Sequence, residues 1–158
     1  VAMRRPYTLA YYHRLVDRIR EDIPHASIGS DIIVGFPGET DDDFAILSAY
    51  LAGSPLTHVH VFPYSDRPGT AAAALPGKVH GAVVRERARV VRDIGRELRR
   101  RFHLEQRGTV RPGLTIEDGT LVVTDNYLKV RIAPGHLRNE WVSVALEADG
   151  DSLVGAVV

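Results

Sequence analysis

Two loops in the first half of the chain carry residue types that could do chemistry. The first loop, Gly-Phe-Pro-Gly-Glu-Thr at 35–40, follows an apolar run at 32–34. Its two glycines would let a cofactor approach the backbone beside a helix N-terminus. The alternative, which the residues alone favour, is a turn that only needs unusual backbone angles. Because three carboxylates follow at 41–43 and no Gly-Lys-Ser/Thr does, it is not a phosphate-binding loop.

The second loop, residues 63–70, places Ser65 next to Asp66. A serine beside an acid suggests a nucleophile, but no oriented base accompanies it, so a loop-stabilising role is favoured. Just before this loop, His58 and His60 alternate on one predicted strand and share a face, a geometry that can ligate a metal. No third ligand is identified, so histidines of the core are the favoured interpretation.

A third candidate is the Thr-Asp-Asn-Tyr motif in the second half of the chain. Asn126 can take the left-handed turn conformation, and Tyr127, Lys129 and Arg131 alternate onto one face. One aromatic ring and two cations on a barrel face suit stacking on bases and pairing with phosphates. The alternative is an ordinary hairpin with an exposed basic edge. Four bases against seven acids in 108–158 give a charge of −3, which opposes strong nonspecific RNA binding.

Composition excludes several classes of protein. The 158 residues contain 20 bases, 20 acids and 44% hydrophobic residues, an ordinary globular balance. With no cysteine, the chain forms no disulfide and no thiolate metal site of its own. No apolar run reaches the ~20 residues of a membrane helix, and no secretory signal is present, so we expect a cytoplasmic protein without membrane contact. Nine arginines at 85–107 favour a solvated helix face over a footprint for an anionic ligand.

Helices and strands that would position these residues follow from periodicity. The predicted order is helix 8–21, strand 27–34, helix 40–51, strand 57–62 and helix 80–103. The run at 32–34 indicates a buried strand, and the two strands should pair in parallel through a right-handed crossover. In such folds the loops after the strand ends hold the chemistry. The buried face of the last helix is predicted to contain Val83, Val90, Ile94 and Leu98.

After residue 106 the pattern changes to short strands separated by turns, at 109–116, 120–124, 127–132, 141–146 and 153–158. Five such strands predict a small closed barrel, since closure removes exposed edges. The boundary near 104–107 divides the chain into 1–104 and 105–158. Because two parallel strands cannot cover both faces of a sheet, we expect the first part to be the end of a larger α/β protein. Its unpaired sheet edge favours a homodimer.

Together, these motifs resemble the radical-SAM methylthiotransferases over almost the whole chain. The motifs that carry the resemblance are Met-Arg-Arg-Pro-Tyr-Thr at 3–8, the strand and turn at 31–40, the segment at 58–70 and Thr-Asp-Asn-Tyr at 124–127. They are most similar to the type that acts on threonylcarbamoyladenosine in tRNA. The resemblance implies an α/β fold class: a partial radical-SAM (TIM-like) barrel segment, followed by a small five-stranded antiparallel β-barrel, the OB-like TRAM domain.

The resemblance also implies cofactors and partners. S-adenosylmethionine and two 4Fe-4S clusters serve the full-length enzyme, which adds a methylthio group to an adenine in the tRNA anticodon stem-loop. Because the chain has no cysteine, the clusters would belong to a missing N-terminal part. The fragment itself is expected to be inactive and to bind substrate but no cofactor. The alternatives are a stand-alone RNA-binding or scaffold module and a methylthiotransferase acting on isopentenyladenosine tRNA or on a ribosomal protein.

The resemblance assigns roles to particular residues. Those implied to bind S-adenosylmethionine are Gly35, Phe36 and Pro37. Those implied to bind substrate or RNA are Phe62, Tyr64, Arg67, Asn126, Tyr127 and Lys129.

Overall fold

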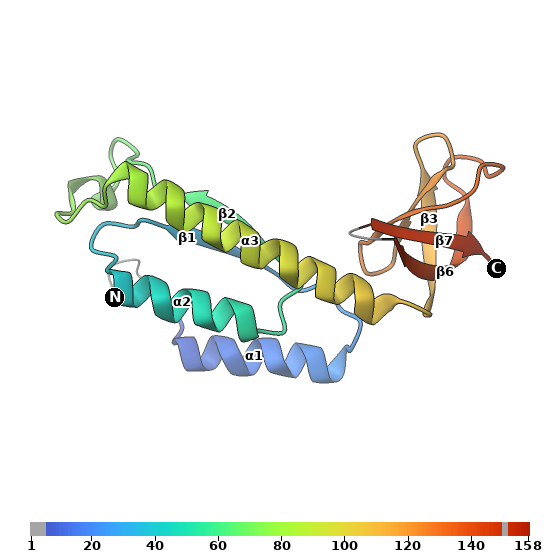
Figure 1. Cartoon of the computed structure of the whole chain (residues 1–158), viewed down its shortest axis with the longest axis horizontal. Coiled ribbons are helices and arrows are strands. Elements are labelled where there is room, and N and C mark those ends of the chain that lie inside the picture. Colours follow the sequence, from blue (N-terminus) through green and yellow to red (C-terminus); the bar gives the residue numbers. More distant parts are fainter. Residues whose placement is uncertain (1–5, 150–151) are drawn as a thin grey trace. The chain divides into compact units, whose positions relative to one another are not determined.

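The chain forms two compact units, seen in a computed structural model that describes residues 6–149 and 152–158 (Figure 1). Unit 1 comprises Val1–Pro24 and Ile28–Leu98, and unit 2 comprises His25–Ser27 and Arg99–Val158. The units therefore divide within the long helix, slightly before the predicted boundary. The first three residues of the motif at 3–8 lie outside the described residues.

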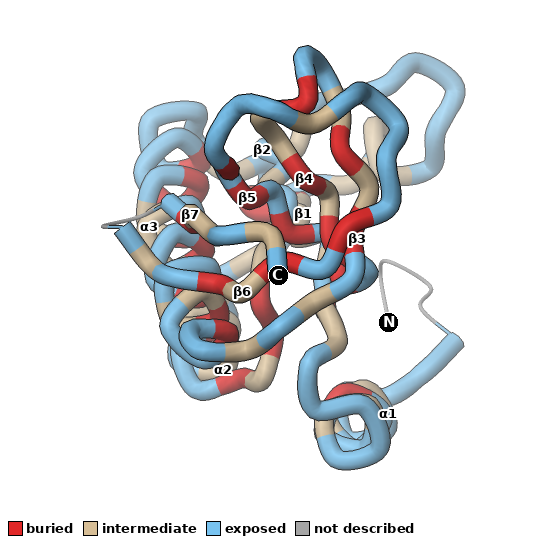
Figure 2. The backbone as a smooth tube through the Cα atoms, turned by 90° about the vertical axis from the view of Figure 1, so that its right-hand side faces the viewer, coloured by how far each residue is buried: buried red, intermediate tan, exposed pale blue. Residues whose placement is uncertain are grey.

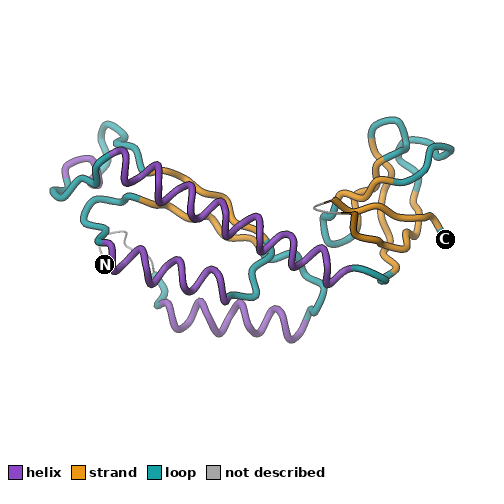
Figure 3. Tube along the Cα trace, in the orientation of Figure 1, coloured by secondary structure: helices purple, strands orange, loops and turns teal. Residues whose placement is uncertain are grey.

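Unit 1 has the predicted order of helices and strands (Figure 3). Its elements are α1 (Leu9–Asp22), β1 (Gly29–Val34), α2 (Asp41–Gly53), β2 (His58–Pro63), the 3-10 helix η1 (Ala71–Ala74) and the first part of α3 (Gly81–Gln106). The strands β1 and β2 pair in parallel, as predicted. A capping box begins α2, in which Thr40 accepts a hydrogen bond from the Asp43 amide and Asp43 accepts one from the Thr40 amide.

One face of the two-stranded sheet packs against helices. On this face, Val59 of β2 lies against Gly95 of α3. The opposite face carries Asp31, His60 and Phe62, which are all exposed. The prediction of a buried strand at 27–34 is therefore wrong for that face, and in β1 only Val34 is fully buried.

The buried stripe of α3 differs from the predicted one. Val83 is 39% exposed, and of the predicted set only Leu98 is fully buried. The observed stripe contains Val84, Arg87, Ala88, Val91, Gly95, Leu98 and Phe102. A Cβ at Gly95 would lie 2.8 Å from Val59, so this glycine marks a close approach of α3 to the sheet. Because glycine contributes no apolar side chain, hydrophobic periodicity missed this rotation of the helix.

Unit 2 is the predicted closed five-stranded barrel. Its strands are β3 (Val110–Ile116), β4 (Leu121–Thr124), β5 (Lys129–Arg131), β6 (Trp141–Asp149) and β7 (Ser152–Val157), in the order β3-β4-β5-β7-β6. Four neighbouring pairs are antiparallel, but β5 and β7 pair in parallel, so the barrel is not purely antiparallel. Figure 2 marks its buried positions. The core consists of Phe102, Val122, Leu128, Val130, Ile132, Val142, Val144, Leu146 and Leu153.

Over the part of the chain that the structure describes, no helix is both long and apolar enough to cross a membrane.

Candidate functional site

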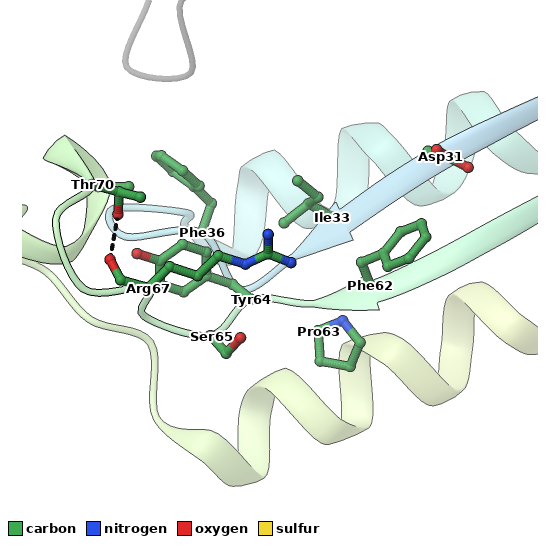
Figure 4. Close-up of a pocket in the computed structure, with 10 residues that line it drawn as sticks. Asp31, Ile33, Phe36, Phe62, Pro63, Tyr64, Ser65, Arg67 and Thr70 are labelled. Carbon is green, nitrogen blue, oxygen red and sulfur yellow. Dashed lines mark hydrogen bonds between the residues drawn. The ribbon is translucent and has the colours of Figure 1, made fainter.

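A pocket of about 580 Å³ opens where β1 and β2 end (Figure 4). It is lined by Asp31, Ile33, Phe36, Phe62, Pro63, Tyr64, Ser65, Arg67, Thr70 and Ala72. These residues come from the two strands and from the loops after them, where parallel α/β folds place their ligands. The pocket brings together Phe36, which the resemblance assigned to the cofactor, with Phe62, Tyr64 and Arg67, which it assigned to the substrate.

Aromatic rings and one cation dominate this pocket. The rings of Phe36 and Tyr64 meet edge to face, with centroids 5.3 Å apart and an interplanar angle of 72°. Phe62 is half exposed, and Arg67 extends from its loop toward the strand ends (Figure 4). Within the described residues, Arg67 makes no ion pair, so its guanidinium is available to an anionic group. The arrangement suits a flat heterocycle that carries a carboxylate or phosphate.

The loop after β2 is held by a small polar network. The Tyr64 hydroxyl donates to Asp66 Oδ1 at 2.8 Å, and Lys78 Nζ donates to the same oxygen at 2.5 Å. The hydrogen bond from Lys78, followed by that from Tyr64, lowers the pKa of Asp66 below its ordinary value. Lys78 also donates to the carbonyls of Ala72 and Ala73. Asp66 thus stabilises the loop, as predicted.

The loop after β1 is a turn that needs unusual backbone angles. Gly35 has φ 76° and Gly38 has φ 86°, both in the left-handed region. The Gly35 amide donates to Glu39 Oε2 at 2.9 Å, and a Cβ at Gly35 would lie 2.5 Å from Val84. The space beside Gly35 is therefore filled by the protein itself. Of the three residues predicted to bind cofactor, only Phe36 lines the pocket, because Gly35 and Pro37 are buried.

Arg87 on α3 anchors this turn, and the sequence analysis missed it. Its Nη1 donates to Glu39 Oε1 and its Nη2 to Asp41 Oδ1, each at 2.6 Å, while its side chain is only 6% exposed. Burial alone would lower the pKa of Arg87, but the hydrogen bonds to Asp41 and Glu39 raise it, so the charge is retained. From the sequence, Arg87 was expected to belong to a solvated helix face. Its place between Val84 and Val91 was the available signal.

His58 and His60 share a face, as predicted, with ring centroids 5.5 Å apart. Thr57 Oγ1 lies 3.0 Å from His58 Nδ1. Across residues 6–149 and 152–158, no group of three or more His, Cys, Asp or Glu side chains is arranged to hold a metal ion.

The Thr-Asp-Asn-Tyr motif of unit 2 forms the turn before β5. Asn126 is only 6% exposed, and its Nδ2 donates to the His25 carbonyl at 3.0 Å and to Gln106 Oε1 at 3.1 Å. Its Oδ1 accepts from Thr124 Oγ1 at 2.7 Å. The left-handed conformation is taken by Tyr127, with φ 62°, and not by Asn126. The side chain of Asn126 is engaged by these hydrogen bonds within unit 2 and stabilises the turn.

That turn displays the other predicted RNA-binding residues. Tyr127 is 83% exposed, and Lys129 and Arg131 of β5 both point to solvent while Val130 between them is fully buried. An exposed ring therefore lies close in sequence to two cations on one outer strand. Such a combination suits nucleic acid, which offers base faces for stacking and phosphates for ion pairing.

Relatives of the chain include tRNA methylthiotransferases and synthases of methylthio-modified adenosine. No protein-family model matches the chain. It is 37% identical over 129 residues to the threonylcarbamoyladenosine tRNA methylthiotransferase MtaB of Aquifex aeolicus, covering 82% of this chain and 31% of the relative. It is 44% identical over 117 residues to the tRNA-2-methylthio-N(6)-dimethylallyladenosine synthase of Mycolicibacterium vanbaalenii, covering 73% and 22%. The synthase of the same name from Mycobacterium avium is 48% identical over 86 residues, covering 54% and 12%. The chain thus spans less than a third of each relative's length.

Proposed function

Because this chain belongs to the methylthiotransferase family, we propose that it forms the C-terminal part of a tRNA methylthiotransferase that acts on N6-threonylcarbamoyladenosine in the cytoplasm. In this proposal, unit 1 is the end of the radical-SAM barrel and unit 2 is the RNA-binding TRAM domain. The activity then requires a longer polypeptide, since the chain spans less than a third of its relatives. The observation that carries the proposal is the pocket at the ends of β1 and β2, which gathers four predicted site residues.

We propose that this pocket takes S-adenosylmethionine or the target adenine, in the longer protein. The rings of Phe36 and Tyr64 offer apolar surface to an adenine, and the unpaired Arg67 guanidinium suits a carboxylate. When bound in the longer protein, one S-adenosylmethionine would supply the radical that activates the adenine carbon, and a second would supply the methyl group. The residues present do not fit an iron-sulfur cluster, because clusters are held by thiolates and this chain has no cysteine.

For unit 2, we propose that the exposed residues of β5 and its preceding turn contact the anticodon stem-loop. Tyr127 and Lys129 support this role by their exposure, whereas Asn126 acts through the turn that it holds. The exposed face of the β1–β2 sheet is proposed to meet the missing N-terminal part of the polypeptide. Alternatively, a second copy of the chain would pair with the edge of this sheet and form a homodimer.

A second candidate function is methylthiolation of dimethylallyladenosine in tRNA. The observation in its favour is the higher identity of the mycobacterial relatives, whose names state that modified nucleoside. Both candidates share the same adenine chemistry and differ in the group carried on N6.

Mass spectrometry of tRNA nucleosides distinguishes the two candidates. The gene encoding this chain is disrupted in its own organism, and digested tRNA is compared with that of the parent strain. Loss of the methylthio form of threonylcarbamoyladenosine supports the first candidate, and loss of methylthio-dimethylallyladenosine supports the second. An unchanged nucleoside profile overturns both. Complementation with Y64A should fail while complementation with L137A restores the modification, because Tyr64 lines the pocket and Leu137 lies exposed on unit 2.

A further inference from the structure

The outer surface of the barrel carries a second exposed aromatic residue, Trp141, which no motif singled out. It begins β6 and is 75% exposed, although it is the largest apolar side chain available to this unit. A small barrel gains nothing for its core from a tryptophan left in water, so a role on the surface is indicated.

Strand register places Trp141 at one end of a row of outward-facing residues. Trp141 lies opposite Leu114, Leu114 opposite Val123, and Val123 opposite Lys129. Side chains directly opposite one another on paired strands project from the same face. The adjacent positions fill the barrel instead, and they include Val122, Val130 and Val142. Leu114 and Val123 remain partly exposed, so an apolar strip leads from Trp141 to Lys129.

We define the Trp141 strip as Trp141, Leu114, Val123 and Lys129. It crosses four neighbouring strands, which separates its ends by about 14 Å at the usual strand spacing. Tyr127, which is 83% exposed, lies in the turn two residues before Lys129. A second exposed aromatic residue is therefore close in sequence to the Lys129 end of the strip.

The charges around the strip favour an anionic partner. Lys129, Arg131 and Arg138 make no ion pair within the described part of the chain. Several acids of the same unit are already engaged by other groups. The engaged pairs are Asp125 with Arg111 at 2.6 Å, Glu147 with Arg107 at 3.3 Å, Glu140 with His136 at 3.5 Å and Asp118 with Thr120 at 2.5 Å. Although unit 2 is acidic overall, Lys129 of the strip and Arg131 two residues later on the same strand are exposed cations that make no ion pair with any described residue.

We propose that the Trp141 strip binds single-stranded RNA, with Trp141 stacking on one base while Lys129 and Arg131 pair with phosphates. This rests on the proposed tRNA substrate, but it identifies a base-stacking residue outside the Thr-Asp-Asn-Tyr motif. An apolar row alone would suit a protein partner. Lys129 and Arg131 at one end, which make no ion pair with any described residue, and the exposed Trp141 ring at the other end fit the stacking platforms and basic grooves of single-strand binders.

The chain contains a built-in probe for this test, since Trp141 is its only tryptophan. The whole 158-residue chain is titrated with a fluorescently labelled single-stranded RNA that has the sequence of an anticodon loop. Binding is followed by anisotropy of the label and, with unlabelled RNA, by tryptophan emission. We expect quenching of Trp141 with the same midpoint as the anisotropy. W141A should weaken binding by at least about tenfold, whereas L137A, which removes another exposed apolar side chain, should not.

Other results would overturn the inference. If anisotropy reports binding while Trp141 emission and the W141A affinity stay unchanged, the strip is not the RNA site, and RNA contact through Tyr127 stands. If emission changes with protein concentration and not with RNA, the strip is a contact between copies of the chain. If no RNA binds, the proposal that the strip binds RNA is wrong. The methylthiotransferase proposal is then still tested separately by the tRNA nucleoside profile. Quenching of the unsubstituted chain is decisive even where W141A does not fold.

Discussion

In unit 1, one sheet face carries exposed Asp31, His60 and Phe62, and the candidate pocket opens at the strand ends. In unit 2, the strands close on themselves around an apolar core, and the candidate residues Tyr127 and Trp141 lie on the outside. The same chain therefore uses two designs. Unit 1 has a pocket lined by candidate site residues at the end of an open sheet. Unit 2 has its candidate residues on the convex outer surface of a closed barrel.

The two designs are stabilised by different interactions. Closure of the barrel pairs every strand with two neighbours, so its stability rests on the apolar side chains inside. The pocket loops of unit 1 instead depend on polar contacts, chiefly those of Arg87 with Glu39 and of Lys78 with Asp66. Substitutions that remove apolar volume should therefore act most strongly in unit 2. Unit 1 should be most sensitive where a turn or buried charge is disturbed.

The largest effect is expected from L146A in the barrel. Leu146 is fully buried, and truncation of such a leucine costs about 2–5 kcal/mol of unfolding free energy through lost burial and a cavity. Urea denaturation with segment-resolved hydrogen exchange should show the loss in the strands of unit 2. The matched control is L137A, which removes the same side chain from a site that is 78% exposed and should change stability by less than about 0.5 kcal/mol. Equal effects of the two variants would mean that the barrel core does not determine the stability of unit 2.

The next effect is expected from G35A in the turn after β1. Its methyl group would meet Val84 at 2.5 Å in a left-handed backbone, so overpacking adds to strain for a total of about 2–4 kcal/mol. G38A places the same methyl group in a left-handed backbone with open space around it, and should cost only about 1–2 kcal/mol. Thermal unfolding of both variants measures the difference. If G38A costs as much as G35A, packing against α3 contributes nothing at this turn.

Much of the fold was predictable from the sequence because its signals are local. Turn residues and short apolar runs predicted the barrel strands, and periodicity predicted a helix from residue 40, close to the observed start of α2. The pocket followed from one topological rule, that loops after parallel strands lie at the same edge of the sheet. Thus Phe36 and Tyr64, distant in sequence, were expected near the same site, and the structure brings their rings together.

What the sequence did not predict depends on long-range contacts. The rotation of α3 follows from its close approach at Gly95, which has no side chain to signal it. The buried position of Arg87 is offset by its ion pair with Glu39, which comes from a turn 48 residues away in the sequence. The parallel pairing of β5 with β7 depends on how the barrel closes, and the outward direction of Trp141 follows from the register of β6 with β3. None of these features has a period or motif in the neighbouring residues.

A smaller effect than that of G35A is expected from R87M. Loss of the guanidinium leaves the Glu39 carboxylate, which is 12% exposed, without its charged partner, and should cost about 2–3 kcal/mol. The control is R89M on the same helix, where the Arg89 side chain is 60% exposed and pairs with Glu86 in solvent, so its loss should hardly change the stability. Chemical denaturation gives both values, and hydrogen exchange should show faster opening of the turn at 35–40 only in R87M. Equal losses of stability in R87M and R89M would mean that the buried ion pair of Arg87 stabilises unit 1 no more than an exposed ion pair does.

The smallest effect is expected in the titration of two surface carboxylates, Asp66 of unit 1 and Asp118 of unit 2. The hydrogen bond from Lys78, followed by that from Tyr64, lowers the pKa of Asp66, and hydrogen bonds from Thr120 lower that of Asp118 in the barrel. A lowered folded pKa means that each contact stabilises its loop above the ordinary carboxyl pKa and is lost as pH falls through the folded value. Both loops should therefore keep their neutral-pH NMR spectra down to about pH 5 and change only below about pH 4.

Salt then distinguishes the two acids. Asp66 owes its shift first to a cation, so about 1 M salt should move its midpoint back toward the ordinary value, because screening weakens exposed ion pairs. Asp118 is held by the hydroxyl and amide of Thr120, which carry no net charge, so its midpoint should stay in place. The midpoints are read from the side-chain carboxyl carbons by NMR titration, with D66N as the assignment control. If salt moves both midpoints equally, the Asp66 contact depends on charge no more than the Asp118 contact does. The difference between the two units would then not include their surface turns.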